Sequence, residues 1–114
     1  MDELTLPREV RAIMDYLQAN APTMSIYVHG DLFTSSSIIR LTPTKLIELI
    51  KLILNRLRLE ERSTTTTAYG KCVNYISHYE KRIDSRRVAY VSLKYAICPK
   101  SAYIWGVSGG VREV

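Results

Sequence analysis

The stretch that decides the fold runs from Thr64 to Arg87 and reads TTTTAYGKCVNYISHYEKRIDSRR. At 100° per residue its apolar side chains fall in one arc and its polar side chains in the opposite arc, which predicts an amphipathic helix over residues 68–83. The preceding threonines would cap the start of that helix through their hydroxyl oxygens. The apolar arc holds Tyr69, Cys72, Val73, Ile76, Tyr79 and Ile83, and the polar arc holds Lys71, Asn74, Tyr75, His78 and Arg82.

The polar arc of this predicted helix is a candidate contact surface for nucleic acid. It combines cations, an amide, a phenol and an imidazole, which are groups that reach phosphates and base edges. A solvated helix face without further function would show a similar mixture, so the pattern leaves both interpretations open.

The positive charge of the chain is concentrated in this stretch and just after it. The net charge of the 114 residues is +5. Residues 1–30 carry two basic and four acidic side chains, whereas residues 63–101 carry seven basic and two acidic side chains. Since clustered cations raise the local electrostatic potential, they favour a polyanionic partner. We expect that partner to be nucleic acid, with DNA ahead of RNA.

The length and composition fit one folded domain. A hydrophobic fraction of 46% with 24% charged residues argues against disorder. We expect a single compact domain over residues 1–107 and a flexible C-terminal tail over residues 108–114.

Two features of the sequence argue against a membrane protein. No apolar run approaches the roughly 20 residues that cross a bilayer, and Asp2 and Glu3 give the start of the chain the wrong charge for a signal peptide. A cytoplasmic protein without a membrane partner is therefore expected. The abundance of Ile, Leu, Tyr, Arg and Glu favours an archaeal hyperthermophile or a virus as its source.

The first thirty residues predict a helix followed by a hairpin. Thr5 can cap a helix that ends near Asn20, with apolar residues at one-sided spacing. Residues 24–29 alternate between apolar and polar side chains, which is typical of a half-buried strand. Gly30-Asp31 then supplies a two-residue hairpin turn.

A second helix is predicted to begin at Thr42-Pro43 and to extend to about Leu59, because a capping hydroxyl followed by proline is a strong start signal. Its apolar arc is broad and marks it as the core helix. Leu52 and Leu59 interrupt the polar side at a spacing of seven and form a candidate homodimer contact. Isolated surface leucines would give the same pattern.

The last third of the chain predicts a second hairpin. Residues 88–97 alternate as in a half-buried strand, the segment from Cys98 to Ser101 forms a turn, and residues 102–107 return antiparallel. Arg86 and Arg87 precede this hairpin. The predicted core face holds Ala89, Val91, Leu93, Tyr95 and Ile97, and the other face holds Val88, Tyr90, Ser92 and Lys94.

The sequence offers little chemistry for catalysis. It has no nucleophile elbow, no phosphate-binding glycine loop and no cluster of metal ligands, so we expect a protein that is not an enzyme, without a cofactor, a metal or a small-molecule ligand. Cys72 and Cys98 are predicted to be free thiols, although a bridge between them stays open as an alternative.

These elements add up to an α+β fold with about three helices packed on a small antiparallel sheet. Their order resembles a winged helix, and the resemblance implies a DNA-binding regulator whose recognition helix lies at residues 68–83. Its expected nucleic-acid contacts are Lys71, Asn74, Tyr75, His78, Arg82, Arg86, Arg87 and Lys94.

Two other functions stay open. In the first, the sheet binds a single strand of DNA or RNA, with Tyr27, Tyr90, Tyr103 and Trp105 as stacking platforms and Lys94 as a neighbouring cation. Packing of these aromatic rings in the core is the competing interpretation. In the second, the chain is an assembly subunit of a ribonucleoprotein or a viral complex.

Overall fold

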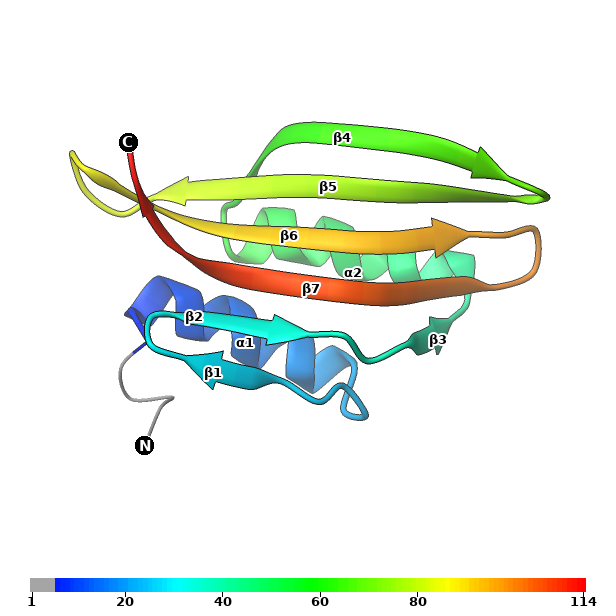
Figure 1. Ribbon diagram of the computed structural model, residues 1–114, viewed down its shortest axis with the longest axis horizontal. Helices are drawn as coiled ribbons and strands as arrows, with labels where there is room; N and C mark the ends of the chain where they lie inside the picture. Colours follow the sequence, from blue (N-terminus) through cyan, green and yellow to red (C-terminus); the bar gives the residue numbers. More distant parts are fainter. Residues whose placement is uncertain (1–5) are drawn as a thin grey trace.

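The computed structural model describes residues 6–114, and these residues form two helices and one antiparallel sheet of seven strands (Figure 1). The elements in chain order are α1 (Arg8–Asn20), β1 (Tyr27–His29), β2 (Leu32–Ser35), β3 (Ile39–Leu41), α2 (Pro43–Arg56), β4 (Glu60–Tyr69), β5 (Cys72–Arg82), β6 (Arg87–Ile97) and β7 (Ala102–Glu113).

The sheet is built around β7. The strand order is β1-β2-β7-β6-β5-β4, and β3 also pairs with β7. Strands β4 to β7 follow one another as an antiparallel meander of long strands, whereas β1, β2 and β3 are short (Figure 1). One edge of β7 therefore carries β6 along its length, and the other edge is shared by β2 and β3.

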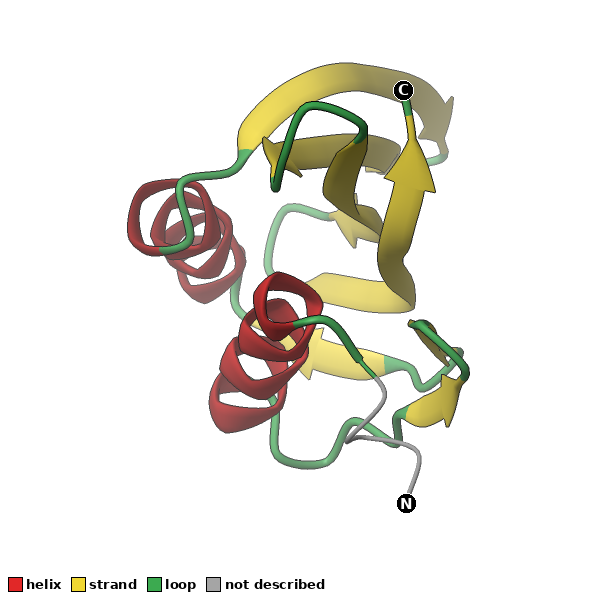
Figure 2. Cartoon of the chain, turned by 90° about the vertical axis from the view of Figure 1, so that its left-hand side faces the viewer, coloured by secondary structure: helices red, strands yellow, loops and turns green. Residues whose placement is uncertain are grey.

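Both helices cover the same side of the sheet (Figures 1 and 2). Each is amphipathic and buries one face, through Val10, Ile13 and Leu17 in α1 and through Leu46 and Ile53 in α2. Each buried branched side chain of this kind contributes roughly 1.5 to 3 kcal/mol. The core therefore lies between the two helices and one face of the sheet, and the helices leave the other face uncovered.

The predicted helix over residues 68–83 is wrong. The stretch forms the end of β4 and all of β5, joined by a turn at Gly70, which has a φ of 61°. An L residue rarely adopts this left-handed conformation, so the glycine favours a hairpin turn. Threonine, tyrosine and isoleucine prefer strands, and pairing of β5 with β6 decided the outcome.

The predicted fold class fails with that helix. Two helices on a seven-stranded sheet replace three helices on a small sheet, and the segment expected to act as a recognition helix is a hairpin. The winged-helix resemblance is therefore wrong as well.

The predicted end of α1 and the predicted start of α2 are confirmed, whereas α1 begins at Arg8 after Pro7 with no side-chain cap. α1 ends at Asn20 as expected, while Thr5, its predicted cap, lies outside the described residues. Thr42 caps α2, since its hydroxyl oxygen accepts a hydrogen bond of 3.1 Å from the backbone N–H of Lys45. α2 ends at Arg56, three residues before the predicted Leu59.

The C-terminal residues 108–113 lie in β7 instead of forming a loose tail. Gly109 makes this possible, because a Cβ at its position would overlap the ring carbons of Phe33, which is fully buried on the paired strand β2. The glycine therefore lets β2 and its aromatic side chain approach β7 closely.

A disulfide joins Cys72 at the start of β5 to Cys98 just after β6. The predicted free thiols are wrong, and the alternative bridge is the one that forms. It closes a loop with a sequence separation of 26 and ties the end of the β4–β5 hairpin to the β6–β7 turn.

Replacing Gly109 with alanine is expected to destabilise the fold by about 1 to 3 kcal/mol. The added methyl group would overlap the Phe33 ring, which is fully buried and would have to shift within a packed core. Chemical denaturation monitored by circular dichroism measures this change. Gly106→Ala is the matched control on the same strand, since its nearest neighbour is the flexible Lys94 side chain at 3.1 Å. Equal losses in both variants would contradict the proposed role of Phe33.

Reduction of the disulfide is expected to lower the free energy of unfolding by about 2 to 4 kcal/mol, the usual range for a loop of this size. Denaturation midpoints with and without a reductant measure the effect. A double variant with Cys72→Ser and Cys98→Ser should unfold at the lower midpoint and ignore the reductant. A midpoint that is the same for the native and reduced protein would show that the bridge adds no stability.

Candidate functional site

The helices leave one side of the sheet uncovered, and we call this side the open face (Figure 1). In an antiparallel ladder, directly opposed residues share a face and successive residues alternate. Ala89, Val91 and Leu93 of β6 lie in the core. The residues that alternate with them along β6 therefore lie on the open face, and so do the ladder partners of those alternating residues on β5 and β7. The centre of the open face is formed by His78 and Glu80 of β5, Tyr90, Ser92 and Lys94 of β6, Ser108, Gly110 and Arg112 of β7, and Thr34 of β2.

Three tyrosines lie on the open face. Tyr90 comes from β6, Tyr103 lies opposite Ala96 of β6, and Tyr27 lies opposite Thr34 on the outer strand β1. Tyr27 is 69% exposed, and the other two are partly exposed. The interpretation in which these rings pack against the helices therefore does not hold, because they point to the opposite side of the sheet.

Trp105 adds a fourth aromatic ring beside a cation. The register of β7 shifts at this residue, between the partners of Lys94 and Tyr95. The Lys94 ammonium lies 5.5 Å from the centre of the Trp105 ring, a cation–π contact. Both side chains line a hollow of about 360 Å³ with Thr34 and Ser108. Stacking and charge are thus available within one surface depression.

A second hollow of about 400 Å³ lies beside the first, and Ser92 lines both. Its rim carries a pair of arginines around one nearly buried carboxylate. Arg62 forms an ion pair of 3.0 Å with Glu80, and Arg112 pairs with the other oxygen of the same carboxylate. Glu60 also lies 3.6 Å from Arg62, so two guanidinium groups face two carboxylates at this rim and their charges balance.

His78 and Ser92 connect the two hollows. The imidazole Nδ1 of His78 lies 2.6 Å from the hydroxyl oxygen of Ser92, and both residues are ladder partners at the middle of β5 and β6. Tyr90 closes the far side, where its ring packs over Gly110. Because Ser92 lines both hollows, together they extend across β5, β6, β7 and β2, and we call this pair of hollows the track.

Some of the residues predicted as nucleic-acid contacts come together on the open face. His78 and Lys94 lie on the track, and Asn74 and Arg82 lie farther along the same side of β5. The predicted stacking residues Tyr90, Tyr103 and Trp105 lie there as well.

Other predicted contacts lie elsewhere. Tyr75 belongs to the helix side of β5 and stacks on Tyr95, with ring centres 4.9 Å apart. Lys71 lies in the turn between β4 and β5, away from the track. The predicted helical face was wrong, so it grouped residues that strand alternation separates.

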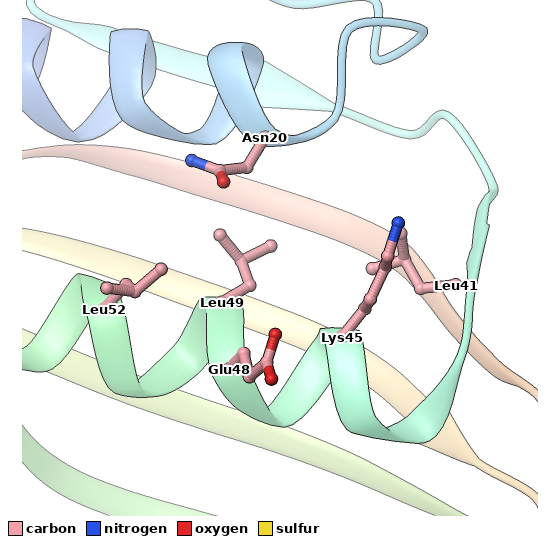
Figure 3. Close-up of a pocket in the computed structure, with 6 residues that line it drawn as sticks. All are labelled: Asn20, Leu41, Lys45, Glu48, Leu49 and Leu52. Atoms are coloured by element: carbon pink, nitrogen blue, oxygen red, sulfur yellow. The ribbon is translucent and has the colours of Figure 1, made fainter.

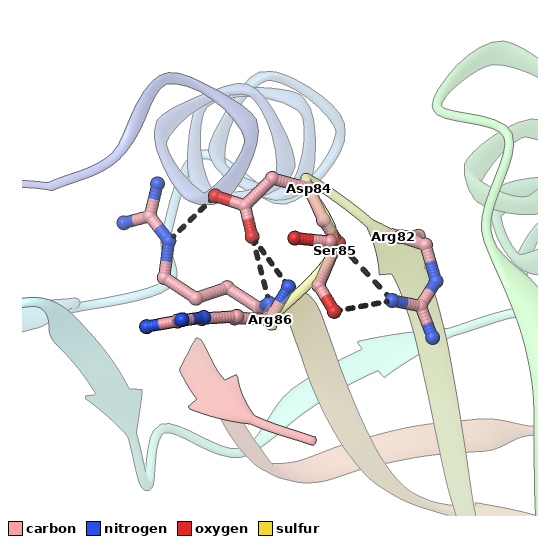
Figure 4. A network of polar contacts seen from close by, with 5 residues as sticks. Arg82, Asp84, Ser85 and Arg86 are labelled. Atoms are coloured by element: carbon pink, nitrogen blue, oxygen red, sulfur yellow. Dashed lines mark hydrogen bonds and ion pairs between the residues drawn. The ribbon is translucent and has the colours of Figure 1, made fainter.

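Arg86 lies in the β5–β6 turn and Arg87 begins β6, and Asp84 organises the chain there (Figure 4). The Asp84 carboxylate accepts hydrogen bonds of 2.9 Å from the backbone N–H groups of Arg86 and Arg87. It also forms an ion pair of 3.0 Å with the Arg87 guanidinium. These hydrogen bonds hold the pKa of Asp84 below its ordinary value of 3.8, and the one from the Arg86 backbone has the largest effect. Arg87 therefore stabilises a turn.

Arg62 and Arg112 are the site residues that sequence reasoning missed. The predicted second helix ends near Leu59 and the next predicted helix covers residues 68–83, so Arg62 lies in neither, and Arg112 lies in the predicted tail. Both lie in strands beside the Glu80 carboxylate. The alternation of residues 88–97 on β6 was the only available signal for the open face, and it did not extend to their strands.

The candidate dimer leucines do not form an exposed pair. Leu59 is only 4% exposed and belongs to the core, which contradicts its predicted role. Leu52 is half-buried and lines a small hollow of about 200 Å³ between α1 and α2, together with Asn20 and Lys45 (Figure 3).

Residues 6–114 show neither a group of three or more potential metal ligands nor a helix long and apolar enough to cross a membrane.

Comparisons with known proteins give the fold a distant neighbour. No protein-family model matches the chain, and no curated protein matches it. Among solved structures, the chain is similar to ORF-99 from the archaeal virus AFV1, a protein described as thermo- and acido-stable. The TM-score is 0.51 at 12% sequence identity, covering 93% of this chain and 90% of that chain. This likeness concerns the fold alone.

The Asp84 turn predicts a stability difference that depends on pH. The lowered pKa means that the folded protein prefers the ionised carboxylate, so this stabilisation is present above pH 3.8 and is lost as the pH falls through the folded-state pKa. Asp84→Asn should therefore melt below the native protein at neutral pH and match it in strong acid. Melting temperatures across a pH series test this.

Asp15→Asn, at an exposed position of α1, is the charge-matched control for that series. A deficit of the Asp84 variant that persists unchanged in acid would contradict the electrostatic explanation.

Proposed function

We propose that the protein binds single-stranded nucleic acid on the open face of its sheet and does not catalyse a reaction. Bases would stack on Trp105, Tyr90 and Tyr103, and phosphates would meet Lys94 and Arg112. The observation that supports this most strongly is the gathering of four aromatic rings on the side of the sheet opposite both helices.

The chemistry of the track matches such a ligand. Aromatic side chains bind unpaired bases through stacking, which every base allows, while neighbouring cations follow the backbone. Trp105 and Lys94 supply both functions within 5.5 Å of each other. Glu80 is the only carboxylate among the central residues of the open face, where it pairs with Arg62 and Arg112, and Glu60 on the neighbouring strand also pairs with Arg62.

A single strand fits this surface better than a duplex. Bases in a duplex are stacked on each other and present only their edges in the grooves. A sheet face with flat rings offers few groups that reach into a groove, but it can hold bases that have left the stack. DNA and RNA single strands share this chemistry, so both belong in the test.

Trp105→Ala is expected to weaken binding of an oligonucleotide by roughly 5- to 150-fold, because stacking on one base contributes about 1 to 3 kcal/mol. Trp105→Phe should retain much of the affinity, since it keeps a ring at the position. Fluorescence anisotropy of labelled DNA and RNA single strands and of a matched duplex measures the affinities. The single strands should bind more tightly than the duplex.

Lys94→Ala should weaken binding and reduce its dependence on salt, because fewer counterions are released when one phosphate contact is lost. Lys51→Ala, an exposed cation on α2 behind the sheet, is the matched control and should leave the affinity unchanged. Affinities at two salt concentrations give the slope. Equal effects of both lysine variants, or the absence of binding at low salt, would refute the proposed site.

A further inference from the structure

Strand β4 is a long edge of the sheet with one neighbour. It stands at the end of the strand order, and within residues 6–114 it pairs with β5 alone (Figure 1). All ten of its residues are exposed. The backbone groups along its outer side face away from the sheet. Such an edge is a template for another strand.

The other strands at the margin of the sheet are short. β1 and β3 have three residues each, and short strands are one of the ways in which proteins protect an edge. β4 has protective features at its start, where Glu60 and Glu61 carry charge and the register shifts between Glu61 and Ser63. The five residues from Ser63 to Thr67 have no charge, no proline and a regular register with β5. This segment is open to pairing.

We propose that β4 pairs antiparallel with β4 of a second copy of this chain, with the two Thr65 residues opposite each other at a two-fold axis. Directly opposed residues of an antiparallel pair must share a face of the sheet. A strand that pairs with itself satisfies this rule when the axis passes a single residue, because residues at equal distances on either side of it have the same orientation.

The sequence of β4 is self-complementary in this register. Thr65 meets Thr65 of the second copy, Thr64 meets Thr66, and Ser63 meets Thr67, so every opposed pair in the regular segment joins two hydroxyl residues. Paired threonines stabilise adjacent strands, whereas like charges in opposition destabilise them. No like charges are opposed in this arrangement.

The residues outside the segment also agree with the register. Arg62 and Glu61 of one copy fall beside Ala68 and Tyr69 of the other, which carry no charge. Tyr69 is 77% exposed in the single chain, so its ring would gain contacts at each end of the interface.

Pairing around this axis would join two sheets into one. A two-fold axis perpendicular to the sheet places both open faces on the same side and both pairs of helices on the other. The assembly would present two copies of the track side by side. The inference goes beyond the proposed function and holds whether or not the track binds nucleic acid.

The test is the molar mass in solution, measured by light scattering after size-exclusion chromatography over a concentration series that reaches the millimolar range. The native protein should approach about 26 kDa, twice the 13.0 kDa of one chain. Thr65→Lys should remain at the monomer mass, because it places two ammonium groups opposite each other at the axis. Thr65→Val, which keeps a β-branched residue without charge, should remain a dimer.

Two results would overturn the proposal. One is a native protein that stays at the monomer mass over the whole series. The other is a dimer that Thr65→Lys leaves intact, since the interface would then lie elsewhere. Circular dichroism of each variant shows whether it is folded, and Thr65 is exposed, so the lysine can be accommodated in the single chain.

Discussion

The burial of one face of β6 and β7 against two amphipathic helices is the constraint on which the rest of the structure depends. Ala89, Val91 and Leu93 of β6 are fully buried, as is Ile104 of β7. Because side chains of a strand alternate, burying these residues fixes which residues appear on the other side. With two helices, both on that buried side, the opposite face stays uncovered. The site is thus a consequence of how the core is filled.

The open face differs from an ordinary solvated sheet in the residues that it carries. A strand face in water usually shows short polar or charged side chains. Here Tyr27, Tyr90, Tyr103 and Trp105 occupy that side, and Lys94 lies against one of the rings. Beside them Arg62 and Arg112 pair with Glu80, and Arg62 also pairs with Glu60. Exposed rings next to cations are the features that single-strand binders combine.

Sequence alone predicted the elements whose signals are local. The cap at Thr42, the turn at Gly30 and the alternation of residues 88–97 were all confirmed, because each depends on neighbouring residues. The stretch from residue 68 to 83 was not predictable in this way, since its apolar residues suit a helical arc and its β-branched and aromatic residues suit a strand. Pairing with β6, a contact between residues distant in sequence, decided it. The prediction of the site residues was incomplete for the same reason, because Arg62 and Arg112 come together only once the sheet has formed.

The most direct test of the open-face site is a nuclear magnetic resonance titration of the folded protein with an unlabelled single-stranded oligonucleotide. We predict that amide and side-chain signals change along β5, β6 and β7, most strongly at Trp105, Lys94 and Tyr90, and that signals of α1 and α2 stay in place. Changes confined to the helices, or to the β5–β6 turn around Asp84, would contradict it.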